Sequence, residues 1–120
     1  MIKPAAIVDV AAMLGVVAAA ALSAASPADA DATAYLINVT VRPGYNFANA
    51  AEALNYGNGI CDELAHGRTY PQIMGAVRTD FSTSDEYQAS YLITQAVNEL
   101  CPAMIWRLRN TAAHYQPPSP

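Results

Sequence analysis

After residue 30, apolar residues recur at spacings of three and four, which is the spacing of helices that bury one face. The clearest stripe predicts a helix over 46–66, with these residues on its inner face: Ala50, Ala53, Leu54, Gly57, Ile60, Cys61 and Leu64. A broad stripe predicts a second long helix over 83–100, with these residues facing inward: Ala89, Leu92, Ile93, Ala96, Val97 and Leu100. Strand-like alternation is absent. The pattern therefore predicts an all-α fold.

Shorter helices are expected over 31–41 and 69–81, and a short fifth helix or a continuation over 103–109. Two capping boxes are expected to open helices, Thr69 with Gln72 and Thr83 with Glu86, and Gly67 suits a helix C-cap. The segment Gly57-Asn58-Gly59 could break the 46–66 helix, but the apolar stripe stays in phase through it. We expect a small bundle of four to five short helices, with residues 31–109 as its domain.

The first 30 residues have the features of a signal peptide: a short start with Lys3, a long Ala-rich apolar run, and Ala28-Asp29-Ala30. We expect cleavage after Ala30, with Ala25 and Ala32 as lesser options. The alternative is an uncleaved membrane anchor, because the run is long enough to span a bilayer. At the other end, residues 110–120 are expected to form a mobile Pro-rich tail.

Two cysteines, Cys61 and Cys101, lie 40 positions apart, and both fall on predicted inner faces. In an exported protein, two cysteines indicate one disulfide. Closing such a loop in the unfolded chain corresponds to about 4 kcal/mol of stability. A zinc site or a reactive thiol is the alternative, but two cysteines without close further ligands make a poor zinc site.

A set of residues resembles a known family: Ala53, Leu54, Gly57, Ile60, Cys61, Leu64, Gly67, Ala96, Cys101 and Pro102. In the domain-of-unknown-function 732 family, a helical stripe ends in Cys followed by Leu and Gly, and a last helix ends in Cys-Pro. The resemblance covers roughly 31–102. It implies a helical fold, export and a disulfide between Cys61 and Cys101 in small, largely mycobacterial proteins, and it implies no activity. The N-terminal helix departs from the family pattern, since Tyr35-Leu36 is followed by Arg42-Pro43-Gly44.

Charge excludes some partners. The whole chain has a net charge of −4, and residues 31–120 contain eight acidic residues and five arginines. Such a surface offers no electrostatic footprint for nucleic acid or anionic lipid. We therefore expect no nucleic-acid partner, and membrane contact only through an uncleaved signal segment.

Candidate catalytic chemistry is sparse. Asp62 and His66 are four apart on one helix, as a metal or proton-transfer pair would be, but a solvated contact explains them as well. His114 has no nearby partner in the sequence. Three serines, Ser82, Ser84 and Ser90, lie at or near a helix start, where serine commonly caps. We assign no catalytic residue, metal or cofactor.

Seven tyrosines are many for a chain of 120 residues. Tyrosine is amphipathic and enriched at binding surfaces. A candidate apolar ligand pocket would be lined by these residues: Tyr56, Met74, Tyr87, Tyr91 and Trp106.

The sequence thus predicts a non-catalytic binding protein that is secreted or held in the cell envelope. Its partner would be an envelope protein or an apolar small molecule. One alternative is a carrier of haem or lipid, which requires an internal pocket lined by tyrosines and aliphatic residues. A second alternative is a small hydrolase, which requires a polar cleft with an ionisable pair in contact.

Overall fold

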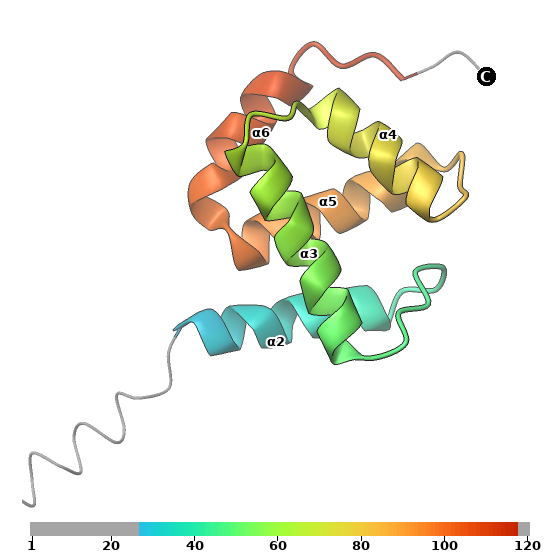
Figure 1. Ribbon diagram of the computed structural model, residues 1–120, viewed down its shortest axis with the longest axis vertical. Helices are drawn as coiled ribbons and strands as arrows, with labels where there is room; N and C mark the ends of the chain where they lie inside the picture. The colour runs from blue at the N-terminus through green and yellow to red at the C-terminus, as the bar shows by residue number, and fades with distance from the viewer. Residues whose placement is uncertain (1–26, 118–120) are drawn as a thin grey trace, which may run out of the picture. The chain divides into compact units, whose positions relative to one another are not determined.

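The computed structural model describes residues 27–117, and contacts divide the chain into two units, Met1–Ala30 and Asp31–Pro120. The helices, in chain order, are α2 (Pro27–Thr40), α3 (Ala50–Ala65), α4 (Tyr70–Asp80), α5 (Glu86–Leu100), the 3-10 turn η1 (Pro102–Met104) and α6 (Ile105–Ala112) (Figure 1). No strand occurs within the described range. The predicted all-α fold is confirmed.

Helix α5 lies at the centre of the helical unit and contacts α3, α4, η1 and α6. Its predicted stripe is buried, with Leu92, Ile93 and Val97 having no exposed surface. The stripe of α3 packs against it through Ile60 and Leu64. The two longest predicted helices therefore form the centre of the core, which residues of α4 and α6 complete.

Where α2 meets α3, the chain needs a residue without a side chain. Tyr35 of α2 is fully buried, and its hydroxyl donates a 2.9 Å hydrogen bond to the carbonyl of Ala53. A Cβ atom added at Gly57 would lie 2.7 Å from Tyr35 Cζ and 2.6 Å from Leu100 Cδ1. Helix α3 therefore runs unbroken through both glycines, and Gly57 provides the space for Tyr35.

Two helix ends agree with the sequence prediction. Thr69 and Gln72 form a capping box at the start of α4. Gly67 has φ +90° after α3, its N–H donates to the Leu64 carbonyl and the Arg68 N–H donates to the Glu63 carbonyl. This is the Schellman arrangement, which satisfies two otherwise free carbonyls.

The start of α5 differs from the prediction. Its N-cap is Asp85, whose carboxylate accepts from the backbone N–H groups of Tyr87 and Gln88, while Thr83 accepts from the N–H of Asp85. Ser82 adopts φ +49° after α4, so the chain turns there and reaches helical geometry later than a Thr83 cap requires. The predicted Thr83–Glu86 capping box is wrong.

The start of α3 also falls later than expected. Asn46 has φ +56°, outside helical geometry, and Asn49 caps the helix by accepting from the Glu52 N–H at 2.8 Å. The residues around Asn46 instead form a loop whose Tyr45 and Phe47 side chains pack against the core. Tyr45 is 4% exposed.

Helical structure extends beyond 31–109 at both ends. Helix α2 begins at Pro27 rather than at Asp31, and α6 continues to Ala112. Tyr115, placed by the sequence in a tail, packs edge-on against Tyr70 at 5.1 Å between ring centroids. Most of the predicted signal segment (1–26) and the last three residues lie outside the described residues. None of the helices in the described range is both long and apolar enough to cross a bilayer.

Cys61 on α3 and Cys101 at the end of α5 form a disulfide, with 6.1 Å between their Cα atoms. The predicted cross-link is confirmed, and it joins the two helices that make the core. Because one face of α3 packs against α5, α4 contacts a different face of α3.

Candidate functional site

The five residues predicted to line one pocket lie apart. Met74 is 1% exposed and belongs to the core, whereas Tyr87 and Trp106 are 69% and 68% exposed. Tyr56 lies between α3 and α4, and Tyr91 lies beside the end of α2. The structure therefore does not bring these residues to a common cavity.

Three of those aromatic rings contact arginines instead. The Arg42 guanidinium lies 4.1 Å from the Tyr91 ring centroid and 4.9 Å from that of Tyr87. Arg109 lies 5.3 Å from the Trp106 centroid. These are cation–π contacts at the surface, where each contributes about 0.5–1 kcal/mol.

The candidate catalytic residues do not form a reactive pair. The His66 ring bonds to the backbone carbonyl of Asp62 at 2.7 Å, not to its carboxylate, and both side chains are exposed. None of the hydrogen bonds found between residues 27 and 117 joins the hydroxyl of Ser82, Ser84 or Ser90 to a histidine or carboxylate. The same range contains no group of three metal-ligating side chains.

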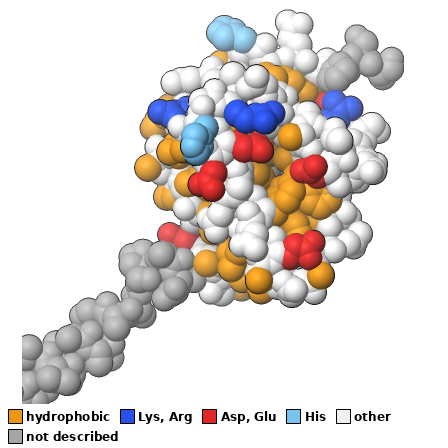
Figure 2. All heavy atoms as spheres, in the orientation of Figure 1, with side chains coloured by type: hydrophobic (Ala, Val, Ile, Leu, Met, Phe, Trp, Pro, Cys, Tyr) orange, Lys and Arg blue, Asp and Glu red, His pale blue; other side chains and the backbone are white. Residues whose placement is uncertain are grey.

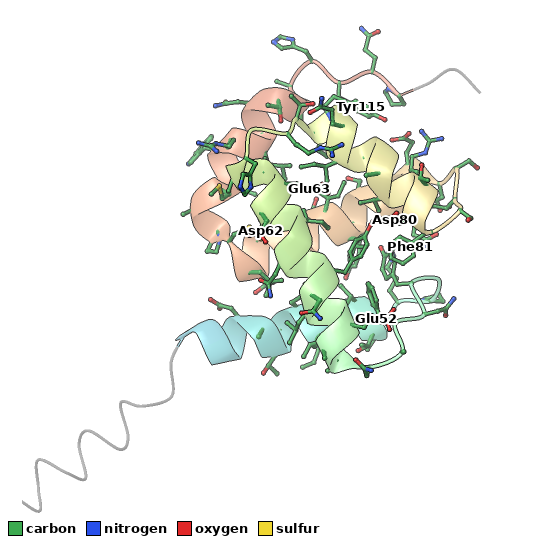
Figure 3. All side chains as sticks on the ribbon, in the orientation of Figure 1. Glu52, Asp62, Glu63, Asp80, Phe81 and Tyr115 are labelled. Carbon is green, nitrogen blue, oxygen red and sulfur yellow. A yellow bond between two sulfur atoms is a disulfide. The ribbon has the colours of Figure 1, made fainter. Side chains whose placement is uncertain are left out.

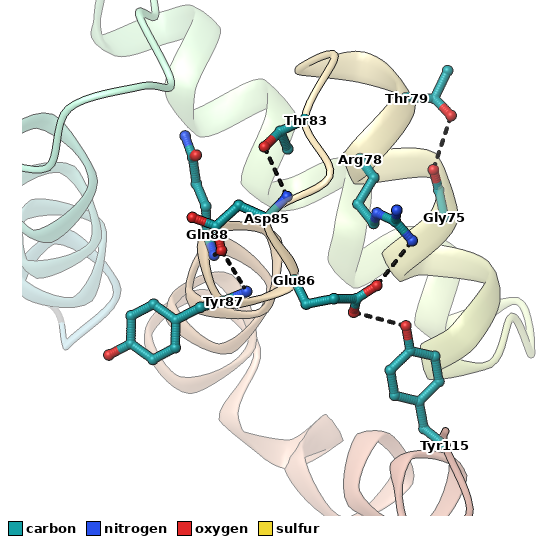
Figure 4. Close-up of polar contacts among 9 residues, drawn as sticks. All are labelled: Gly75, Arg78, Thr79, Thr83, Asp85, Glu86, Tyr87, Gln88 and Tyr115. Atoms are coloured by element: carbon teal, nitrogen blue, oxygen red, sulfur yellow. Dashed lines mark hydrogen bonds and ion pairs between the residues drawn. The ribbon is translucent and has the colours of Figure 1, made fainter. Parts of the chain in front are cut away.

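Arg78, Glu86 and Tyr115 form a polar cluster between three segments of the chain. Arg78 and Glu86 form a 2.8 Å ion pair, and the second oxygen of Glu86 accepts from the Tyr115 hydroxyl at 2.7 Å (Figure 4). Desolvation raises the pKa of Tyr115 to about 12, and the hydrogen bond that its hydroxyl donates to Glu86 acts in the same direction. This contact ties α4, α5 and the segment after α6 together.

A groove runs between α3 and α4. Helix α3 contributes Asn55, Tyr56, Gly59, Ile60 and Glu63, one strip at helical spacing, and α4 contributes Ala76, Val77 and Asp80. It is hollow because Gly59 and Ala76 are small, and a Cβ added at Gly59 would meet no atom within 4 Å. Its volume is about 170 Å³.

An aromatic cluster adjoins the Tyr56 end of the groove. Phe81, at the end of α4, meets Tyr56 edge-on at 5.2 Å and Phe47 at 5.7 Å between centroids. Phe47 and Tyr56 are 5.8 Å apart, and Tyr45 packs behind Phe81 at 5.4 Å. Each such pair contributes about 0.5–1.5 kcal/mol beyond its buried area, so this end is held rigidly.

Acidic side chains border the groove. Asp80 accepts a 2.8 Å hydrogen bond from the Tyr56 hydroxyl, and Glu63 lies on the opposite wall. Figure 3 shows Glu63, Asp80 and Glu52 around the side of α3 that faces α4, and Figure 2 shows a hydrophobic strip between acidic side chains on this face. Burial raises the pKa of Tyr56, and its bond to Asp80 and the charges of Asp80 and Glu63 act in the same direction. The groove thus lies in a negative field.

Sequence reasoning singled out Tyr56 but missed the groove around it. A signal was present: Gly59 and Ile60 follow Tyr56 by three and four positions, so they share its helix face. The sequence does not indicate that α4 is the helix that packs beside this face of α3.

Two larger hollows among the described residues are less suited to an apolar ligand. One, of about 370 Å³, is lined by Arg42, Pro43, Asp85 and Gln88. Another, of about 540 Å³, is lined mainly by polar residues of the α4–α5 connection. Sites for drug-sized ligands are typically concave, mostly apolar and about 300–1,000 Å³, so neither resembles a haem or lipid pocket.

Comparison with known proteins gives a family without an activity. Residues 28–103 match the family described as Protein of unknown function (DUF732). No curated protein and no solved structure shows significant similarity to the chain.

Proposed function

The chain belongs to the DUF732 family, whose function is unknown, and from its surface we propose that it is an exported, non-catalytic module that binds a partner protein through the α3–α4 groove. The observation that carries this proposal is the groove itself. It is lined by Tyr56, Ile60 and Val77, it opens to solvent, and its end is held by ring contacts.

Its size favours a side chain over a cofactor. At about 170 Å³ the groove is smaller than the roughly 300 Å³ at which small-molecule pockets begin. Haem or lipid would need a larger apolar cavity. A hydrolase would need an activated nucleophile. The raised pKa of Tyr56 keeps its hydroxyl protonated, so the hydrogen-bonded pair of Tyr56 and Asp80 is a poor nucleophile.

Export is supported by two features of different kinds. The N-terminal apolar run followed by Ala28-Asp29-Ala30 suits a signal peptide. The Cys61–Cys101 disulfide suits an oxidising compartment. Cleavage after Ala30 would leave Asp31 at the new start of α2, where a carboxylate favours the positive end of the helix dipole.

Site-specific photo-crosslinking tests partner binding. We would place p-benzoylphenylalanine at Asn55, an exposed residue of the groove, and as control at Asn110, an exposed residue of α6. In a native-like host, we expect a crosslinked protein band for position 55 only. No band, or the same bands at both positions, would contradict the proposal.

The intact mass of the exported protein tests the proposed export and cleavage after Ala30. We expect the mass of the chain that begins at Asp31, less two hydrogens for the disulfide. Protein that keeps its first 30 residues and remains with the membrane would instead identify an uncleaved anchor.

A further inference from the structure

We propose that the occupant of the groove is a segment of a partner protein that inserts an arginine or lysine side chain between Glu63 and Asp80. This rests on the proposed function and adds the chemical class of the partner. The juxtaposition that carries it is a narrow apolar groove bordered by two carboxylates on opposite helices.

The charge of the groove is unmatched within the described residues. Its two ionisable carboxylates, Glu63 and Asp80, come from different helices, and no basic residue lines it. The one ion pair found between residues 27 and 117, Arg78–Glu86, involves neither of them. A cation brought to this position would therefore gain two attractive interactions without displacing an ion-pair partner, and Asp80 would keep its hydrogen bond from Tyr56 on one oxygen.

The shape of the groove suits a long cationic side chain. Ile60 and Val77 line the groove although they are only 3% and 2% exposed, and Tyr56 and Ala76 add apolar surface for the methylene stem of lysine or arginine, whose charged head meets the carboxylates. The Tyr56 ring lines the same groove, so a guanidinium seated there lies near an aromatic ring, as a cation–π contact requires. Arg42 of this chain makes that kind of contact with Tyr91, at 4.1 Å.

Most arginines of a second copy are less suitable occupants, and Arg68, which is exposed, is the one whose entry the dependence on protein concentration tests. Arg78 is paired with Glu86, Arg42 lies over two tyrosine rings, and Arg107 donates to the Leu64 and Ala65 carbonyls. Each would have to give up its present contact to enter the groove of a neighbour. A basic segment of another protein has no such cost.

Titration with designed peptides tests the inference. The ligand is an acetylated, amidated ten-residue peptide of alternating leucine and arginine, and its control has glutamine in place of arginine. Each is added to the disulfide-bonded, ¹⁵N-labelled protein while amide shifts are followed. We expect the arginine peptide to shift the amides of Tyr56, Gly59 and Ala76. The glutamine peptide should bind at least about fivefold more weakly.

Variants localise the effect. The double variant Glu63→Gln with Asp80→Asn keeps the size of both side chains and a hydrogen-bond acceptor for Tyr56. It should weaken binding of the arginine peptide by about fivefold or more. Asp62→Asn, an exposed change outside the groove, should leave binding unchanged. Added salt should weaken binding to the unmodified protein.

The outcomes separate the inference from the proposed function. If the glutamine peptide binds the groove as tightly as the arginine peptide, the basic partner is wrong while a docking groove remains. If neither peptide moves groove amides, the inference fails, and the crosslink at position 55 decides the function independently. Groove shifts that depend only on protein concentration would identify a second copy as occupant and also overturn the inference.

Discussion

At the scale of single residues, Gly57 and Gly59 show how two glycines of one helix have opposite roles. Gly57 lies beneath Tyr35, where an added Cβ would come within 2.7 Å of the ring, whereas an added Cβ at Gly59 meets nothing within 4 Å. The same substitution should therefore have opposite effects at positions two residues apart.

We predict that Gly57→Ala destabilises the protein and that Gly59→Ala stabilises it. A Cβ at Gly57 meets three atoms closer than 3.0 Å, so we expect overpacking near the upper end of the range of about 1–3 kcal/mol. This cost outweighs the gain of about 1 kcal/mol from helix propensity, which Gly59→Ala keeps in full. Urea unfolding of the two variants measures this directly. Equal changes in both would mean that Tyr35 does not pack on Gly57.

Buried tyrosines should make the fold sensitive to alkali. Burial raises the pKa of Tyr35 and of Tyr45 from about 10 to about 12, and their hydroxyls bond to the carbonyls of Ala53 and Gln88. A raised pKa means that the folded state holds the proton more tightly. This contribution is complete below pH 10 and is lost as the pH rises from 10 through 12.

We therefore expect the free energy of unfolding to fall above pH 10, by up to about 2.7 kcal/mol for each of these two tyrosines. Denaturant unfolding at pH 8 to 11.5 measures it. The double variant Tyr35→Phe with Tyr45→Phe is the control. Its free energy of unfolding should be lower at pH 8 but should fall less steeply as the pH rises. An identical slope in both proteins would show that these hydroxyls do not contribute.

At the scale of elements, the apolar stripes predicted most of the fold. Leu92, Ile93 and Val97 are buried as their spacing indicated, because a helix with one broad apolar face has one way to bury it. Helix starts were less predictable: Thr83 and Asp85 are both good caps, and only the left-handed turn at Ser82 decides between them.

Asp85→Ala should cost about 1 kcal/mol, because two backbone N–H groups at the start of α5 lose their acceptor. Thr83→Ala should cost less than about 0.5 kcal/mol, since its hydroxyl accepts only from the N–H of Asp85. Thermal unfolding compares the two. The reverse order would restore Thr83 as the cap.

The candidate site was less predictable for a different reason. Helical spacing indicates which residues share a face of one helix, but not which two helices meet. Tyr87, Tyr91 and Trp106 were grouped with Tyr56 by residue type, and α5 and α6 present the first three to solvent or to arginines. The groove requires Ala76 of α4 to face Gly59 of α3, which follows from tertiary packing alone.

At the scale of the whole molecule, the disulfide joins the helices of the core across 40 residues. Removing it with Cys61→Ala and Cys101→Ala together should cost about 2–5 kcal/mol. Reducing agent should lower the unmodified protein to the same stability and leave the double variant unchanged. Stability that does not respond to reducing agent would mean that the bond contributes little.

The central claim is that the space beside Gly59 receives a basic side chain of a partner. Gly59→Leu should fill that space without unfolding the protein, because leucine favours helix and its Cβ meets no neighbour. We predict that this variant melts no lower than the unmodified protein and no longer binds the leucine–arginine peptide. A stable Gly59→Leu protein that binds the peptide as before would contradict the claim.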